Sequence, residues 1–164
     1  MKTSEIQQTV CREEILKGNL PCENVGHLLS WECDVLSINK SGYLSEFEVK
    51  ITRSDFLAEK KKVRKWQLMN ARSEWTCPNY FWYVCPVDLI SQSEIPDYAG
   101  LIHITNSGAS EIIRKPVLLH KGKKDRIKVL NTFCRIISER KYLGSCMLTY
   151  QNKKIRERNL QLLS

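Results

Sequence analysis

Residues 31 to 51 read Trp31-Glu32-Cys33-Asp34-Val35-Leu36-Ser37-Ile38, Asn39-Lys40-Ser41-Gly42 and Tyr43-Leu44-Ser45-Glu46-Phe47-Glu48-Val49-Lys50-Ile51. The two apolar runs have the composition of β-strands, and the polar tetrapeptide ending in glycine predicts a hairpin turn between them. Asp34, Glu48 and Lys50 place charges inside these strands, where an unpaired carboxylate or ammonium is costly to bury. Two carboxylates and a lysine on one sheet face would form a cation site beside an amine, which suits metal-dependent phosphodiester cleavage.

The register of this hairpin decides whether the charges meet. A three-residue loop with Gly42 in the left-handed conformation pairs Asn39 with Tyr43 and puts Asp34 directly opposite Glu48. Directly opposed residues have Cβ atoms about 4.5–5.5 Å apart, and a slip by one residue would move the two carboxylates to opposite faces. Side chains alternate along a strand, so Lys50 shares the charged face. The other face then carries an apolar set suited to a core: Cys33, Val35, Phe47 and Val49.

The pattern resembles the PD-(D/E)XK nuclease superfamily, in which an aspartate is followed across a hairpin by Glu-X-Lys, here Asp34 and Glu48-Val49-Lys50. The surrounding residues, over about 1–115, are similar to the MmcB-like type of small bacterial and phage proteins linked to DNA repair. Cys33 stands where the superfamily name has a proline, at a position that varies. The resemblance implies an α/β fold with a restriction-endonuclease-like core (α-β-β-β-α-β), in which helices flank a mixed central sheet.

The resemblance also implies a catalytic site. Asp34, Glu48 and the backbone carbonyl of Val49 would ligate Mg²⁺ or Mn²⁺ through hard oxygen atoms. The metal would polarise the scissile phosphate, and Lys50 would stabilise or orient the attacking hydroxide. Many members add a glutamate from the first helix; Glu5 is the candidate for this metal ligand, with Glu13 and Glu14 as alternatives. The expected activity is that of a metal-dependent endodeoxyribonuclease that hydrolyses DNA in repair, recombination or phage DNA processing.

Other interpretations remain open from the residues alone. Asp34, Glu48 and Lys50 could form a cross-strand ion network on a solvated face, a common arrangement in antiparallel sheets. Glu46 shares their face and is expected near the turn and solvated, whereas Glu32 could pair with Lys50 or contact the metal through water. Two further function classes are a non-catalytic nucleic-acid-binding module with the same fold and an interaction subunit of a larger assembly.

The charge of the chain favours a polyanionic partner. The formal net charge is +8 and the isoelectric point is near 9.2, with basic clusters over residues 60–65, 121–128 and 153–158 that would neutralise the phosphates of DNA. The predicted nucleic-acid contacts on the helix after the hairpin are Lys60, Lys61, Lys62, Arg64, Lys65 and Gln67. Four aromatic residues could stack on bases, although core packing or loop anchoring is their expected role: Trp66, Trp75, Trp82 and Tyr83. No apolar run approaches a membrane span, so we expect a cytoplasmic protein without membrane contact, and the sequence leaves a homodimer open.

The remaining sequence predicts one domain over 1–164, with a core over about 1–115 and a helical extension over about 125–164. The expected elements are helices at 3–16, 54–68, 125–141 and 153–163, strands at 31–38, 43–51, 79–86, 101–104 and 111–114, and a loop at 20–29. Ser54 is the expected N-cap of the second helix, whose basic run should face outwards. The seven cysteines lack metal-ligand spacing and are expected to be reduced and mostly buried.

Overall fold

The computed structural model describes residues 1–26, 28–59 and 62–143, without the side chains of residues 63 and 64. The chain divides into two compact units, residues 1–129 and 130–164. The boundary falls inside the C-terminal helix α4, Arg126–Leu143. The predicted helix at 153–163 and the basic cluster at 153–158 lie outside the described residues.

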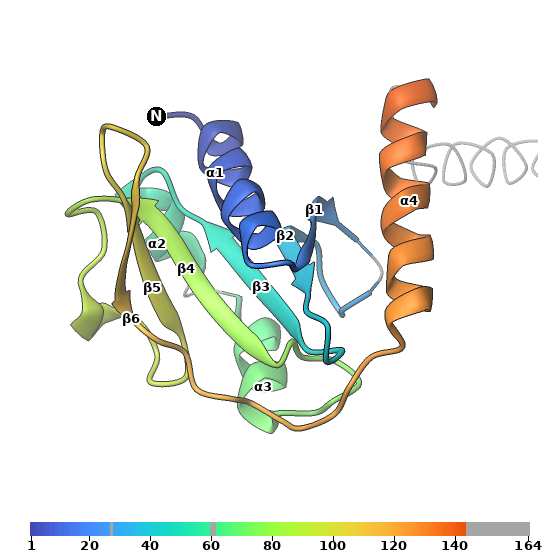
Figure 1. Ribbon diagram of the computed structural model, residues 1–164. Helices are drawn as coiled ribbons and strands as arrows, with labels where there is room; N and C mark the ends of the chain where they lie inside the picture. Colours follow the sequence, from blue (N-terminus) through green and yellow to red (C-terminus); the bar gives the residue numbers. More distant parts are fainter. Residues whose placement is uncertain (27, 60–61, 144–164) are drawn as a thin grey trace, which may run out of the picture. The chain divides into compact units, whose positions relative to one another are not determined.

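The first unit contains a six-stranded mixed sheet with the strands in chain order (Figure 1). The strands are β1 Leu20–Val25, β2 Cys33–Ile38, β3 Leu44–Val49, β4 Tyr80–Pro86, β5 Gly100–Ile104 and β6 Ser110–Arg114. Pairing is antiparallel from β1 to β3, parallel from β3 to β5, and antiparallel between β5 and β6. The chain is therefore a mixed α/β protein with a mixed central sheet, as the sequence predicted.

Helices cover both faces of this sheet. Helix α1, Thr3–Leu16, places Ile6 and Val10 in one apolar cluster with strand residues Val35, Phe47, Val49, Val84, Ile102 and Ile104. Helices α2, Arg53–Glu59, and α3, Val63–Ala71, contribute Phe56 and Met69 to a second cluster with Phe81, Tyr83 and Leu101. The two clusters alternate along β4, because neighbouring side chains of a strand point to opposite faces. Sheet and helices thus follow the predicted order α-β-β-β-α-β, with the second helical segment divided in two.

Two local predictions are wrong. Residues 20–29 were expected to form a loop, but residues 20–25 form strand β1 at the edge of the sheet. Pro21 and Asn24 disfavour a strand, yet an edge strand tolerates proline because one side of it donates no ladder hydrogen bonds. The helix expected at 54–68 is two helices, and its cap is Thr52 rather than Ser54: the Thr52 hydroxyl accepts a hydrogen bond from the Asp55 amide at 3.2 Å.

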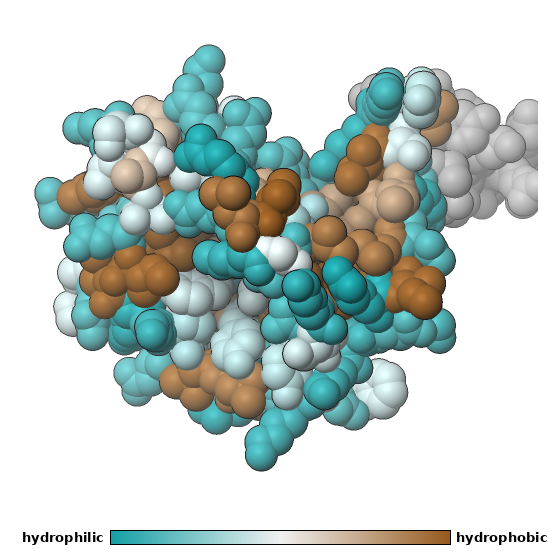
Figure 2. Space-filling view, viewed as in Figure 1, coloured by the Kyte–Doolittle hydropathy of each residue, from teal (hydrophilic) through white to brown (hydrophobic). Residues whose placement is uncertain are grey.

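The other elements match their predictions within a few residues, including α1, the strands of the hairpin, β4, β5, β6 and α4. On the face drawn in Figure 2, hydrophobic residues lie in separate groups among hydrophilic ones. Within the described residues, no helix is long and apolar enough to cross a membrane. None of the six cysteines in this part of the chain forms a disulfide, and four of them are buried: Cys22, Cys33, Cys77 and Cys85.

Candidate active site

The hairpin between β2 and β3 has the predicted register. The Asn39 amide donates to the Tyr43 carbonyl at 3.0 Å, and the Gly42 amide donates to the Asn39 carbonyl at 3.1 Å. Gly42 has a φ of +84°, the left-handed conformation that closes a three-residue loop. The ladder runs from Ile38 opposite Leu44 to Val35 opposite Phe47. One further step in this register puts Asp34 opposite Glu48.

Asp34 lies beside the backbone of β3. Its Oδ2 accepts a hydrogen bond from the Val49 amide at 2.8 Å. Burial, and next the charge of Glu48, raise the pKa of Asp34 to about 6, while the Val49 amide, Lys50 and Lys65 lower it. The charge of Glu48 is thus felt by the Asp34 carboxyl group, which agrees with their opposed positions in the hairpin.

Both oxygens of Glu48 carry a lysine partner. Lys50 Nζ lies 2.8 Å from Glu48 Oε1, and Lys65 Nζ lies 2.8 Å from Glu48 Oε2. Lys50 also lies 3.3 Å from Glu59 Oε2 and 3.4 Å from Asp55 Oδ1. Lys50 and Glu48 are both buried. The predicted contact between Glu48 and Lys50 is therefore present, and Lys65 from α3 joins it.

Lys65 bridges three carboxylates. Besides Glu48, its ammonium lies 3.0 Å from Glu46 Oε1 and 3.2 Å from Glu59 Oε1. It also lies 5.3 Å from the centre of the Trp31 ring and 4.9 Å from that of Phe81. We call Glu46, Glu48, Lys50, Glu59 and Lys65 the carboxylate–lysine cluster. Burial alone would lower the pKa of Lys65, but the three glutamates outweigh it and raise that pKa, so the ammonium is held charged.

The pKa values of the other two glutamates of the cluster are shifted in opposite directions. Glu46 is fully buried; burial is the main reason that its pKa is raised to about 7, although Lys65 and a hydrogen bond from Trp31 Nε1 at 2.7 Å oppose the shift. Burial would also raise the pKa of Glu59, but Lys65, Lys62 and Lys50 outweigh it and lower that pKa to about 2. Glu46 Oε2 is buried without a hydrogen-bond partner. The expectation that Glu46 would be solvated is wrong, because α3 covers this face.

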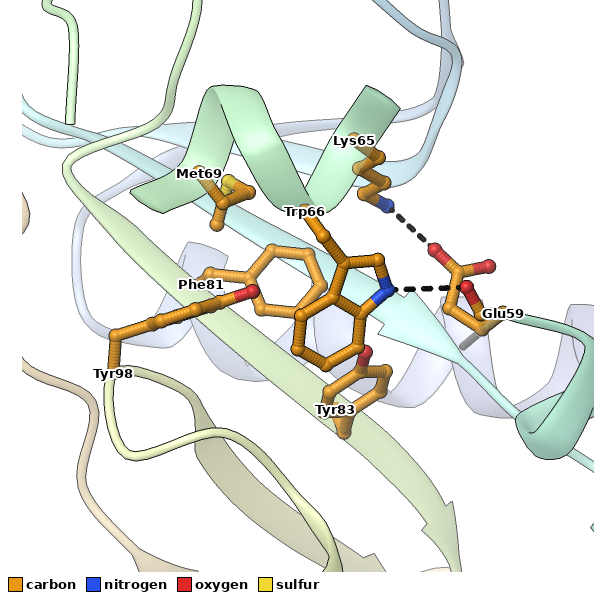
Figure 3. A pocket seen from close by; sticks show the side chains of 7 residues that line it. All are labelled: Glu59, Lys65, Trp66, Met69, Phe81, Tyr83 and Tyr98. Atoms are coloured by element: carbon orange, nitrogen blue, oxygen red, sulfur yellow. Dashed lines mark hydrogen bonds and ion pairs between the residues drawn. The ribbon is translucent and has the colours of Figure 1, made fainter. Parts of the chain in front are cut away.

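A small pocket lies next to the cluster on the α3 side. It encloses about 170 Å³ of empty space, open solvent included, and is lined by Glu59, Lys65, Trp66, Met69, Phe81, Tyr83 and Tyr98. Figure 3 shows two contacts of Glu59. Its carboxylate forms an ion pair with Lys65, and its backbone carbonyl accepts a hydrogen bond from Trp66 Nε1 at 3.2 Å. The aromatic rings crowd together edge to face, with Phe81 and Tyr83 centroids 5.1 Å apart. The pocket walls hold Glu59 and Lys65 in place.

The predicted metal ligands are only partly brought together. Asp34 and Glu48 are neighbours, and the Val49 amide faces Asp34; its carbonyl points the same way, because both groups of a strand residue lie on one side. Glu5 is elsewhere: its Oε2 accepts the backbone N–H of Lys2 at 2.7 Å at the start of α1. Among the described residues, no three His, Cys, Asp or Glu side chains converge closely enough to hold a metal ion.

A polar residue of α1 that reaches the hairpin is Gln7. Its Nε2 donates to the Asp34 backbone carbonyl at 3.1 Å and to Asn24 Oδ1 at 2.9 Å. Gln7 is buried, so this amide fixes β1, β2 and α1 to one another beside the candidate site. Glu13 and Glu14, the alternatives to Glu5, are engaged with Ser110 and with Lys17 and Asn19 respectively.

The predicted nucleic-acid contacts after the hairpin do not form one outward-facing row. Lys65 is buried in the carboxylate–lysine cluster, so the expectation that it faces outwards is wrong. Lys62 lies 2.6 Å from Glu59 Oε2 with an exposed side chain, and Gln67 is exposed. Lys60, Lys61 and the side chain of Arg64 lie outside the described part of the chain. Glu32 is exposed.

Sequence reasoning missed Glu59, Lys65 and Trp31 as members of this site. Lys65 sits in a run of basic residues, which is typical of a solvated helix face. One local signal was present: Glu59 is a single acidic residue directly before that run, and an acid and a base six residues apart meet only if the helix breaks between them. The division into α2 and α3 supplies that break.

No protein-family model matches the chain, and no curated protein matches it. The fold class is shared with a solved structure, the SPO1766 protein of unknown function from Silicibacter pomeroyi, which is 20% identical over 82% of this chain and 85% of that chain, with a TM-score of 0.62. A likeness at this identity shows the mixed α/β fold alone.

Proposed function

We propose that the chain is a divalent-metal-dependent nuclease of the PD-(D/E)XK type that hydrolyses DNA phosphodiester bonds. One observation carries the proposal: the hairpin register sets Asp34 opposite Glu48, with the Val49 amide 2.8 Å from Asp34 and Lys50 Nζ 2.8 Å from Glu48. This places two carboxylates, a peptide and an ammonium at the end of β3. A plain surface ion network would be solvated, whereas Glu48 and Lys50 are buried.

The donor types fit Mg²⁺ or Mn²⁺. Asp34, Glu48 and the Val49 carbonyl would hold the ion, and water would complete its shell, since such ions are usually bound through one or two carboxylates. When bound, the ion makes its water more acidic and polarises the phosphate. After burial, the charge of Glu48 is the next cause that raises the pKa of Asp34, and a cation held between the two carboxylates would relieve this repulsion.

The chain's own residues then act on the substrate as follows. The Val49 amide holds the carboxylate of Asp34, and Gln7 Nε2 holds the backbone carbonyl of the same residue. Lys50 is held by Glu48, Glu59 and Asp55, and its pKa is raised by these carboxylates against the effect of burial. A charged ammonium at this position would stabilise the developing negative charge on the phosphate and orient the attacking hydroxide.

A cleavage assay tests the proposal. Single-stranded, duplex and branched DNA are incubated with Mg²⁺, Mn²⁺ or EDTA, and the Asp34→Asn variant is compared with Asp97→Asn, a change at an exposed aspartate. Asp34→Asn keeps the shape and one acceptor, so loss of metal-dependent cleavage with an unchanged circular dichroism spectrum supports the proposal. Cleavage by Asp34→Asn at the wild-type rate, or wild-type cleavage in EDTA, would overturn it.

A second candidate is a non-catalytic nucleic-acid-binding module of the same fold. It is favoured by the contacts of Glu48, whose two oxygens each already lie beside a lysine. A metal ion would have to displace Lys65 from Glu48 or share that carboxylate with it. The two functions separate in isothermal titration calorimetry with Mn²⁺. The nuclease binds Mn²⁺ and loses it in Asp34→Asn, whereas the module binds DNA in a salt-sensitive way without Mn²⁺ binding or cleavage. A subunit that acts only through protein contacts would bind neither.

The biological setting remains part of the proposal. A structure-selective activity in DNA repair, recombination or phage DNA processing, carried out in the cytoplasm, agrees with the basic charge of the chain. A homodimer would let two such sites cut both strands of a duplex. Analytical ultracentrifugation with and without duplex DNA measures whether the protein is a monomer or a homodimer.

A further inference from the structure

Three segments that are distant in sequence meet at the turn of the β2–β3 hairpin. They are the turn itself around Gly42, the loop 72–79 before β4, and the stretch 119–124. The Lys124 amide donates to the Gly42 carbonyl at 2.9 Å. A Cβ on Gly42 would lie 2.8 Å from the Lys124 carbonyl oxygen, so glycine permits both the positive φ and this close approach.

A buried asparagine holds the three segments together. Asn79 is fully buried; its Oδ1 accepts the Leu44 amide at 2.7 Å, and its Nδ2 donates to the carbonyls of Gly122 at 2.8 Å and His120 at 3.0 Å. His120 Nε2 lies 3.1 Å from the Cys77 carbonyl. Since each segment is fixed to the core through the same side chain, the surface that they form is built before any ligand arrives.

Aromatic rings and ammonium groups alternate on this surface. Trp75 is 78% exposed, and Lys124 Nζ lies 5.7 Å from its ring centre while donating to the Glu74 carbonyl at 2.6 Å. Lys123 Nζ lies 5.8 Å from the ring centre of Tyr43. We call Tyr43, Trp75, Lys123 and Lys124 the hairpin-end surface. The same segments also carry three exposed cations: Lys40, Arg72 and Lys121.

We propose that the hairpin-end surface binds single-stranded nucleic acid, with a base stacked on Trp75 and neighbouring phosphates held by Lys123 and Lys124. An exposed ring beside cations is the combination that single-strand-binding surfaces use, because every base has a π-face and every linkage a negative charge. A duplex fits less well, since its bases are already stacked on one another. The acidic neighbours are Glu74 and Asp125, and Asp125 is occupied by the amides of Ile127 and Lys128.

The position of this surface also bears on the candidate active site, in a step that rests on the proposed nuclease function. Tyr43 directly precedes β3 and lies five residues before Glu48, which is about 17 Å along an extended strand. A single strand of a few nucleotides can span that length. A strand anchored at Trp75 would therefore present a phosphate several nucleotides away to Asp34 and Glu48.

Binding is tested without metal, so that no cleavage occurs. Fluorescence anisotropy of labelled single-stranded DNA, single-stranded RNA and duplex DNA of one sequence is measured in EDTA over a range of salt concentrations. The wild type should prefer the single strands, and Trp75→Ala should weaken single-strand binding by about 5- to 100-fold, as expected for one stacked base. The control Ile112→Ala, another exposed apolar residue, should bind as the wild type does.

The lysines are tested by the salt dependence. Lys123→Ala should lower the slope of log K against log salt by about 0.7, the value for one phosphate contact of a single strand. Lys115→Ala removes the same charge from an exposed position elsewhere and should leave the slope unchanged. Equal slopes for the two lysine variants, or wild-type affinity in Trp75→Ala, would overturn the inference. Comparing the affinities for single-stranded DNA and single-stranded RNA shows which of the two nucleic acids is the ligand.

Failure of this inference differs from failure of the proposed function. If the protein cleaves DNA with Mn²⁺ but Trp75→Ala binds single strands as the wild type does, the nuclease proposal stands and the proposal for the hairpin-end surface is wrong. If binding in EDTA depends on Trp75 but no cleavage occurs, the proposal for the surface stands and the nuclease proposal is wrong. Quenching of tryptophan fluorescence by oligothymidylate, absent in Trp75→Phe, supports the stacked base by a second measurement.

Discussion

The carboxylate–lysine cluster and the hairpin-end surface each contain a lysine whose ammonium lies over an aromatic ring, but the two lysines have different surroundings. Lys65 lies over the rings of Trp31 and Phe81 and is buried among Glu46, Glu48 and Glu59. Lys124 lies over the ring of Trp75, which is exposed, and its ammonium donates a hydrogen bond to the Glu74 backbone carbonyl. The first lysine neutralises charges within the fold, and the second remains available to charges from outside. Burial, rather than residue type, separates a structural cation from a binding one.

The largest effect that tests this comparison is expected for Lys65→Ala. It leaves three buried carboxylates without their shared cation, and breaking a buried ion pair by removing one partner typically costs about 3–5 kcal/mol. Urea denaturation monitored by circular dichroism measures the loss. Lys115→Ala, an exposed control, should stay within about 0.5 kcal/mol of the wild type. A cost below about 1 kcal/mol would show that Lys65 is not an internal counter-ion.

Glu46→Gln sharpens the comparison through pH. A pKa raised from 4.5 to about 7 means that the folded state holds the proton more tightly than the unfolded state. The contribution of Glu46 to stability is therefore present below pH 4.5 and lost as the pH rises to 7, by roughly 3 kcal/mol for a buried group. Glu46→Gln should remove this loss, so that its free energy of unfolding relative to wild type increases between pH 5 and 8. A parallel pH dependence of the two proteins would contradict the assignment.

Asn79→Ala tests whether the hairpin-end surface depends on its buried anchor. It removes hydrogen bonds to the turn and to residues 120 and 122 and leaves the Leu44 amide buried without a partner. The expected cost is about 2–3 kcal/mol in thermal or urea unfolding. Single-strand binding should weaken as well, although Asn79 itself is fully buried. Destabilisation with unchanged binding would show that the surface does not depend on this anchor.

Lys124→Ala gives the smallest change in stability. An ammonium over an exposed ring contributes about 0.5–1 kcal/mol, so the unfolding free energy should fall by no more than that, while single-strand affinity falls. This is the reverse of Lys65→Ala, whose effect is on the fold. If Lys124→Ala destabilised the protein as strongly as Lys65→Ala, the contrast between the two regions would be lost.

The sequence predicted what local rules control. Loop length and glycine geometry set the hairpin register, so Asp34 could be placed opposite Glu48, and period-two alternation separated Glu48 from Phe47 and Val49. It did not predict that α3 would turn Lys65 inwards, because the meeting of Lys65 with Glu46 depends on a helix break and on tertiary packing. Strand β1 was missed for a related reason: Pro21 and Asn24 argue against a strand locally, and pairing with β2 at the sheet edge overrides that preference.

Gly42 gives the molecule one residue on which two separate properties depend. Its positive φ sets the three-residue turn that aligns Asp34 with Glu48, and its missing side chain lets residues 123 and 124 lie against that turn. A substitution there would disturb strand alignment and surface assembly together. A substitution at position 42 is therefore expected to be tolerated only with compensating changes in both the hairpin loop and residues 119–124, so these two segments should change together.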